Sequence, residues 1–212
     1  MTNGEKSPDR KKEILQAATK ILNEKGLQRL SFESVANEAG LSRQLVRYYF
    51  TDLDALVADL SDYLGNVYRE ILVAGVLKVG EVERLRFFMD FLFDLAVEDR
   101  MPANLEAYDA MVAYSVGSQN VRERMRAQYM TLGQVIAHEL AIAHPDLDGP
   151  SCEELSFVFV SMMHAHWSFV ASLRFSRDHS QVMRDAIDRL IASYIAEGPQ
   201  NSRIKTTWSH DD

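Results

Sequence analysis

The chain of 212 residues is 47% hydrophobic and carries a net charge of -8, from 31 acidic and 23 basic side chains. This composition supplies enough apolar residues for a buried core and excludes a chain that is disordered throughout. The single cysteine, Cys152, excludes an internal disulfide and a thiolate metal cluster. The polar first residues do not resemble a signal peptide and no apolar run approaches the roughly 20 residues of a membrane span, so we expect a cytoplasmic protein.

The charge is distributed unevenly along the chain. Residues 1–50 hold nine Lys and Arg against six acidic residues, a net charge of +3, whereas the remainder carries -11. A small basic module on an acidic body approaches a polyanion such as DNA favourably in only one orientation. An acidic surface exposed to solvent accounts equally well for the charge of -11 on the remainder of the chain.

The first predicted helix spans residues 9–25. Apolar side chains recur there at helical spacing, and Gly26 follows in the position of a C-terminal stop. The apolar stripe consists of Ile14, Leu15, Ala18, Ile21 and Leu22.

Residues 31–50 fit two short helices joined by a glycine turn, the outline of a helix-turn-helix. Ser31 and Ser42 are residue types that cap helices, and Gly40 can adopt the positive φ of a helix end. The apolar faces of all three helices can share one small core, formed by Ile14, Ala18, Ile21, Leu22, Val35, Val46 and Phe50.

The second helix of this pair carries polar residues on its outer face, namely Arg43, Gln44, Arg47 and Tyr48. Arginine can pair with guanine, glutamine with adenine, and arginine or tyrosine with phosphate. The residues predicted to contact DNA are Ser31, Ser42, Arg43, Gln44, Leu45, Arg47, Tyr48 and Tyr49. The alternative interpretation is a solvated face on a small helical hairpin.

The remaining periodicity predicts an all-α protein of about nine helices. Further helices are expected over residues 53–73, 81–98, 103–116, 119–143, 151–175 and 179–196. The expected organisation is a DNA-binding head over residues 1–50, a helical body over 51–198 and a disordered tail over 199–212. The segment 151–175 is apolar on both sides, which predicts contact with its own body on one side and a second subunit on the other. With the last helix it could form a four-helix dimer seam.

Residues 10–56 resemble the N-terminal domain of the TetR family of bacterial transcriptional regulators. The matching pattern consists of Ser31, Val35, Ala36, Ala39, Gly40, Leu41, Ser42, Tyr48, Tyr49 and Phe50. The resemblance implies an all-helical homodimer with two heads on a palindromic operator in double-stranded DNA, and a pocket for a small-molecule effector in the larger C-terminal part. Members often have Gly-Thr-Leu-Tyr or Gly-Ala-Leu-Tyr where residues 44–47 stand here, and many place a phosphate-binding lysine at the position of Leu53. The operator therefore cannot be transferred from the family.

The pocket implied by the resemblance would be lined by aromatic and methionine side chains of the body. The candidates are Phe88, Phe91, Tyr108, Met111, Met163, His166, Trp167 and Phe169. Each would serve equally well as plain core, and a hydrogen-bonded core or interface histidine is the competing interpretation of His166.

No motif for catalysis or metal binding is present in the sequence. It contains no Gly-rich phosphate loop, no Gly-x-Ser-x-Gly elbow and no HExxH. His164 and His166 would point about 200° apart on a helix and could not hold one metal. We predict no enzymatic activity, no metal and no cofactor. The predicted function is a ligand-responsive transcriptional regulator, a repressor released from its operator by a small-molecule inducer; the alternative is an all-helical protein-interaction dimer without DNA binding.

Overall fold

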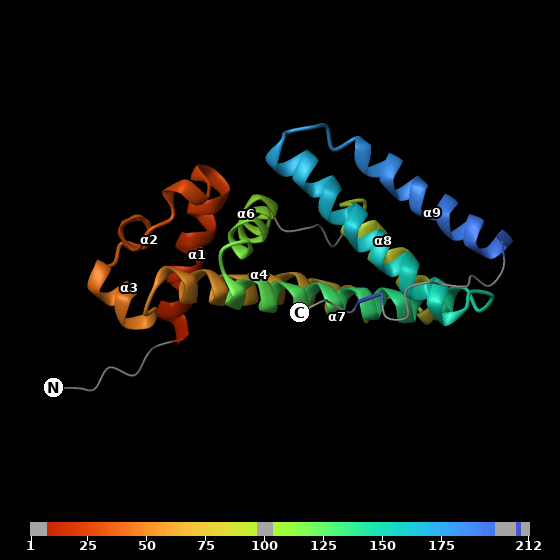
Figure 1. Cartoon of the computed structure of the whole chain (residues 1–212), viewed down its shortest axis with the longest axis horizontal. Helices are drawn as coiled ribbons and strands as arrows, with labels where there is room; N and C mark the ends of the chain where they lie inside the picture. The colour runs from red at the N-terminus through yellow and green to blue at the C-terminus, as the bar shows by residue number, and fades with distance from the viewer. Residues whose placement is uncertain (1–7, 97–103, 198–206, 209–212) are drawn as a thin grey trace. The chain divides into compact units, whose positions relative to one another are not determined.

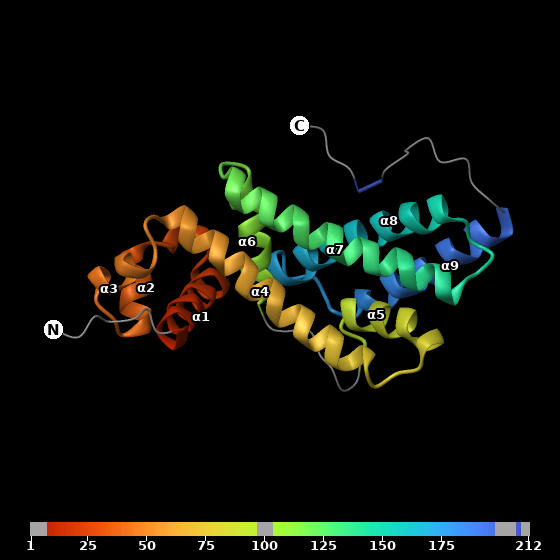
Figure 2. The ribbon, with the colours of Figure 1, turned by 90° about the horizontal axis from the view of Figure 1, so that it is seen from below.

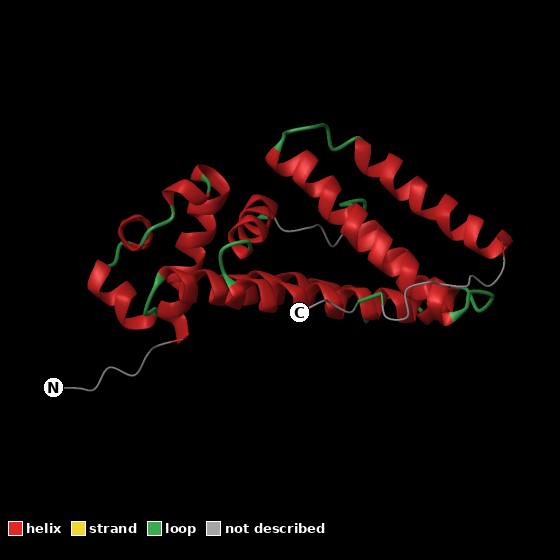
Figure 3. Ribbon diagram, viewed as in Figure 1, coloured by secondary structure: helices red, strands yellow, loops and turns green. Residues whose placement is uncertain are grey.

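A computed structural model describes residues 8–96, 104–197 and 207–208. Every regular element within these ranges is helical, which confirms the all-α prediction (Figure 3). The described α-helices are α1 Pro8–Lys25, α2 Phe32–Ala39, α3 Arg43–Tyr49, α4 Leu53–Val76, α5 Arg84–Leu92, α6 Leu105–Ser115, α7 Gln119–Ala143, α8 Gly149–Trp167 and α9 His179–Glu197. Two 3-10 turns (η1 Leu27–Arg29 and η2 Glu81–Glu83) and one π-helical turn (η3 Ser168–Ser172) complete the set.

The chain divides into two compact units. The first unit comprises Met1–Val67 with Ala103–Arg126, and the second comprises Tyr68–Pro102 with Ala127–Asp212. Helices α4 and α7 each contribute residues to both units. The domain boundary placed after residue 50 stays a prediction.

The first unit is built on the three-helix core predicted from the sequence. Helix α1 packs on α2 and α6, and α2 packs on α3 (Figure 1). All seven predicted core side chains are buried, none more than 2% exposed. The Asn23 side-chain oxygen of α1 also accepts a hydrogen bond from the Ala107 amide of α6 at 3.0 Å, which satisfies a backbone donor at the start of α6.

The second unit contains α5, α8 and α9 with the C-terminal parts of α4 and α7 (Figure 2). Helices α8 and α9 pack together. A glycine allows close packing of α4 against α5, because a Cβ atom at buried Gly75 would lie 1.9 Å from Cζ of Phe87.

Helix α5 is shorter than the predicted helix over residues 81–98. It ends at Leu92, and Asp94 takes up the left-handed region with φ of 57°. The Leu95 amide donates to the Asp90 carbonyl at 2.7 Å, and Arg177 pairs with the Asp94 carboxylate at 2.6 Å. A non-glycine residue in this conformation costs free energy, and its tertiary ion pair offsets part of that cost.

Helix α8 departs from the predicted 151–175 at both ends. It begins at Gly149 because the Asp148 carboxylate accepts a hydrogen bond from the Ser151 amide at 2.8 Å. It ends at Trp167, and the π-helical turn η3 follows it. Of the tail predicted to be disordered, residues 199–206 and 209–212 lie outside the described ranges, whereas Thr207 and Trp208 form a turn.

One segment, Gly149–Ser172, is long and apolar enough to cross a membrane by length and mean hydropathy alone. The expectation that no stretch approaches a span was therefore wrong by this criterion. Half of the apolar window is buried inside the protein. Buried core helices share this composition, so the segment is weak evidence for membrane insertion.

Candidate nucleic-acid interface

Local hydrogen bonds fix the two helices of the helix-turn-helix. The Ser31 hydroxyl accepts from the Ser34 amide at 3.1 Å, while the Ser34 hydroxyl accepts from the Ser31 amide at 2.9 Å, a reciprocal capping box. Gly40 ends α2 at φ 66° and ψ 28°, and the Ser42 hydroxyl accepts from the Leu45 amide at 3.1 Å. The predicted caps at Ser31 and Ser42 and the turn at Gly40 are thus confirmed.

The polar face of α3 is directed outward. Arg43, Gln44, Arg47 and Tyr48 are exposed, as predicted, and Val46 beneath them is fully buried. Of the other residues predicted to contact DNA, Ser31 and Ser42 are exposed, and Leu45 and Tyr49 are half-buried. The Tyr48 and Tyr49 rings meet edge to face with centroids 5.5 Å apart. A continuous surface of these side chains is therefore available to a partner.

Several basic side chains elsewhere in the first unit are paired with carboxylates. Lys20 and Lys25 both contact Glu38, at 2.5 and 3.4 Å. By contrast, Arg43 and Arg47 form no ion pair with any described residue. Positive charge on α3 is thus left available for an external anion.

Lys11 of α1 makes its contacts within the first unit. Its ammonium group lies 2.7 Å from the Asp59 carboxylate and 5.7 Å from the Phe50 ring centroid. Arg47 remains exposed, with its guanidinium 5.9 Å from the centroid of Phe32. Arg47 is therefore the better candidate for a phosphate contact.

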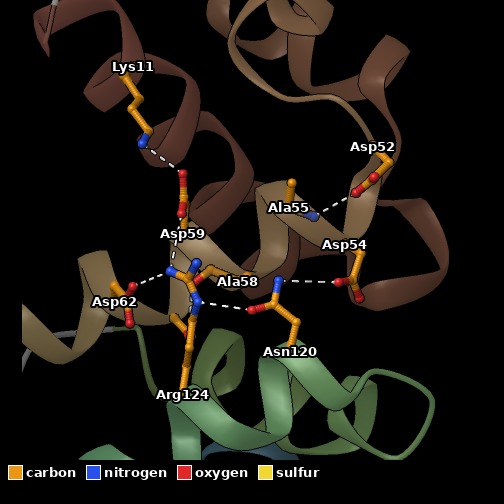
Figure 4. Close-up of polar contacts among 10 residues, drawn as sticks. Lys11, Asp52, Asp54, Ala55, Ala58, Asp59, Asp62, Asn120 and Arg124 are labelled. Atoms are coloured by element: carbon orange, nitrogen blue, oxygen red, sulfur yellow. Dashed lines mark hydrogen bonds and ion pairs between the residues drawn. The ribbon is translucent and has the colours of Figure 1, made fainter.

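A polar network joins α1, α4 and α7 within the first unit (Figure 4). The Arg124 guanidinium of α7 contacts two carboxylates of α4, Asp59 at 3.2 Å and Asp62. Asp59 also receives Lys11 of α1. Arg124 therefore neutralises two acidic groups that lie one helical turn apart. Because Asp59 contacts both Arg124 and Lys11, it connects α7 to α1.

Asn120 extends the same network by one turn of α7. Its side-chain oxygen accepts from Nε of Arg124 at 3.2 Å, and its side-chain nitrogen donates to the Asp54 carboxylate at 3.4 Å. These contacts anchor the start of α7 to the start of α4. Sequence reasoning missed the network, since no local signal pairs residues more than 60 positions apart.

The residues proposed to line a ligand pocket are divided between the units. Tyr108 and Met111 lie on α6 in the first unit. The other six belong to the second unit: Phe88, Phe91, Met163, His166, Trp167 and Phe169. Of these, only Phe169 is exposed, at 54%.

His166 and Trp167 are held by hydrogen bonds within the second unit. The Trp167 indole donates to the Leu92 carbonyl at 2.8 Å, and Nε2 of His166 lies 3.1 Å from the Ser180 hydroxyl. His164 faces elsewhere, with Nδ1 2.8 Å from the Tyr129 hydroxyl. The two histidines thus have different partners, and these bonds support the interpretation of His166 as a satisfied core histidine.

We expect His166 to make the protein less stable in mild acid. Burial lowers its pKa below the ordinary value, and the neighbouring His179 lowers it further. The unfolded chain then binds the proton more readily, so the free energy of unfolding should fall as pH drops through about 6.5. His166→Gln, which retains a hydrogen-bonding side chain, should flatten the dependence between pH 5 and 7 in urea unfolding.

His144 provides the matched comparison, because burial also lowers its pKa while Asp188 and Asp146 oppose that shift. His144→Gln should therefore leave the His166 contribution in place. An unaltered pH profile in the His166 variant would contradict the assignment.

Comparison with known proteins agrees with this geometry. Residues 14–60 match the family model described as bacterial regulatory proteins, tetR family. The HTH-type transcriptional regulator BetI of Escherichia coli is 22% identical over 163 residues, which cover 74% of this chain and 80% of BetI.

Solved structures with similar folds can be aligned with most of the chain. A TetR transcription regulator from Haloarcula marismortui superposes with a TM-score of 0.76 at 20% identity, covering 88% of this chain and 98% of that one. A transcriptional regulator from Saccharomonospora viridis, solved in complex with choline, gives a TM-score of 0.73 at 17% identity, with coverage of 88% and 97%. Residues 14–60 therefore carry the sequence match to the tetR family of bacterial regulatory proteins, and most of the chain shares the fold of a TetR transcription regulator.

Proposed function

We propose that this protein is a cytoplasmic, dimeric repressor that binds a palindromic operator and is released from it by a small-molecule inducer. The observation that carries the proposal is the outer face of α3, where Arg43, Gln44 and Arg47 are exposed on a capped helix that a buried Val46 fixes. A helix of this kind fits the major groove.

The residues of the interface divide into two roles. Arg43 and Gln44, at the N-terminal end of α3, are proposed to contact base edges, and Leu45 a thymine methyl group. The remaining contacts are proposed to be with phosphate, from Ser31, Ser42, Arg47, Tyr48 and Tyr49. In this arrangement the first group sets sequence preference and the second sets register and overall affinity.

The proposed dimer places two such heads on one operator. Exposed apolar side chains remain on the α8–α9 part of the second unit, namely Phe169, Leu173, Phe175, Val182 and Ile195. A symmetric pair that buries this surface would form the four-helix seam. Two heads then read half-sites about 34 to 36 Å apart, or a multiple of that spacing.

The proposed inducer is a small molecule bound by the body. Support comes from the Saccharomonospora viridis regulator of similar fold, which was solved with choline. An inducer releases DNA only if it binds the non-binding arrangement of the dimer more tightly than the DNA-binding one. Mass spectrometry of small molecules retained by the purified dimer, followed by operator release with each compound, would identify the inducer.

Binding to DNA upstream of its own gene tests the proposed function most simply. Fluorescence anisotropy should show a salt-sensitive complex that survives excess unrelated duplex. Binding that the unrelated duplex removes completely would favour the alternative, a dimer whose head binds a protein.

Arg47→Ala should reduce the salt dependence of operator binding. Loss of one phosphate contact lowers the slope of log K against log salt by about one unit. Anisotropy titrations over a series of salt concentrations provide the measurement, and Arg29→Ala is the control because Arg29 is exposed in the same unit but outside α3. An unchanged slope removes Arg47 from the phosphate contacts.

A further inference from the structure

The described part of the C-terminus makes specific contacts with α8. The Trp208 indole Nε1 donates a hydrogen bond to the Ser156 hydroxyl at 2.9 Å. Its ring meets Phe157 edge to face, with centroids 5.2 Å apart and planes at 64°. Ser156 is itself fully buried. These contacts satisfy the polar edge of the indole and cover part of an exposed aromatic side chain.

Helix α7 has a gap in its side-chain surface at the position that the indole occupies. A Cβ atom built on Gly133 would lie 1.9 Å from Cζ2 of Trp208 and 2.1 Å from its Cε2. Glycine in a helix interior is unfavourable relative to alanine, so its presence in the middle of α7 needs a compensating reason. The close approach of Trp208 supplies that reason.

We propose that Trp208 is a C-terminal latch. It occupies a docking site formed by Gly133 of α7 with Ser156 and Phe157 of α8, and the occupant is the same chain's own C-terminus. All four residues belong to the second unit. The latch ties α7 to α8 through an indole that buries apolar area on both helices and makes one directed hydrogen bond.

Helix α7, on which the latch acts, contributes residues to both units. Helix α7 is continuous from Gln119 to Ala143, carrying Arg124 in the first unit and Gly133 in the second. The latch thus makes Trp208 part of the packed structure of the second unit.

Tryptophan fluorescence tests the latch in the full-length protein. The chain has two tryptophans, and Trp167 is buried with its own hydrogen-bond partner. The difference between wild type and Trp208→Phe therefore isolates the emission of Trp208. A docked indole should emit at shorter wavelength and be quenched by acrylamide several-fold more slowly than an indole in the unfolded chain.

Gly133→Ala tests the docking site itself. The added methyl group should displace the indole, shift its emission to longer wavelength and raise its acrylamide quenching several-fold. The melting temperature should also fall, whereas alanine at an unoccupied helical glycine would raise it. Gln134→Ala, at the neighbouring exposed position, should leave the emission unchanged.

Three results would overturn the latch. The first is a Trp208 that is quenched as readily in the folded protein as in the unfolded one. The second is a Gly133→Ala protein that melts at higher temperature with unchanged Trp208 emission. The third is a chain ending at Thr206 that sediments as a monomer where the full chain is a dimer, because the tail would then belong to the subunit interface.

Discussion

Replacing Arg43 with alanine should weaken operator binding by about 5- to 150-fold, the equivalent of about 1 to 3 kcal/mol for one bidentate base contact. Arg43 is the first residue of α3, it is exposed, and it forms no ion pair with a described residue. The substitution should therefore remove the proposed contact to a base without disturbing the fold. Anisotropy with operator and with unrelated duplex measures the effect.

Comparing operator with unrelated duplex distinguishes a contact of Arg43 with a base edge from an electrostatic contact with phosphate. Arg43→Ala should reduce affinity for operator much more than affinity for unrelated DNA, because only the operator presents the matching base edge. Arg29→Ala removes the same charge from the same unit outside α3 and should affect both duplexes slightly. Equal losses for both duplexes with Arg43→Ala would show that the side chain contacts phosphate only.

Arg124→Ala should lower the free energy of unfolding by about 1 to 2 kcal/mol. Isolated surface ion pairs contribute less, but this guanidinium is shared by Asp59, Asp62 and Asn120. Its removal leaves two carboxylates on adjacent turns of α4. Lys11, which contacts Asp59, is then the one cation left in this network. The partial exposure of Arg124, at 35%, keeps the expected loss in this range. Urea unfolding provides the measurement.

Two further variants define what Arg124 contributes. Arg126→Ala removes a charge from the same helix and should be close to neutral, because Arg126 forms no ion pair with a described residue. Arg124→Lys should recover only part of the stability, since an ammonium group cannot reach both carboxylates as a fork does. Equal stabilities for the Arg124 and Arg126 alanine variants would show that the network contributes nothing to the free energy of unfolding.

The sequence was informative wherever the signal is local. Ser31, Gly40 and Ser42 act within four residues of their own position, so residue type alone predicted both caps and the turn. The three-helix core was predicted for the same reason, because helical spacing places Ile14, Val46 and their neighbours on inner faces. The head could therefore be predicted in detail.

Features that depend on tertiary contact were missed or misplaced. The early end of α5 depends on a left-handed Asp94 that Arg177 contacts from more than 80 positions away. Trp208 falls in a polar tail whose composition predicted disorder, and its docking site exists only once α7 and α8 are folded. Likewise, spacing alone could not distinguish pocket from core for His166, which the structure joins to Ser180.

Footprinting of the operator complex, paired with sedimentation of the same sample, tests whether a symmetric dimer reads DNA through the outer face of α3. We expect a dimer that protects two symmetric half-sites on one face of the duplex, centred about 34 to 36 Å apart or a multiple of that distance. Arg43→Ala should abolish that protection at concentrations where Arg29→Ala retains it. A monomer in solution, or a footprint that persists when Arg43, Gln44 and Arg47 are all replaced by alanine, would contradict the claim that the outer face of α3 reads DNA.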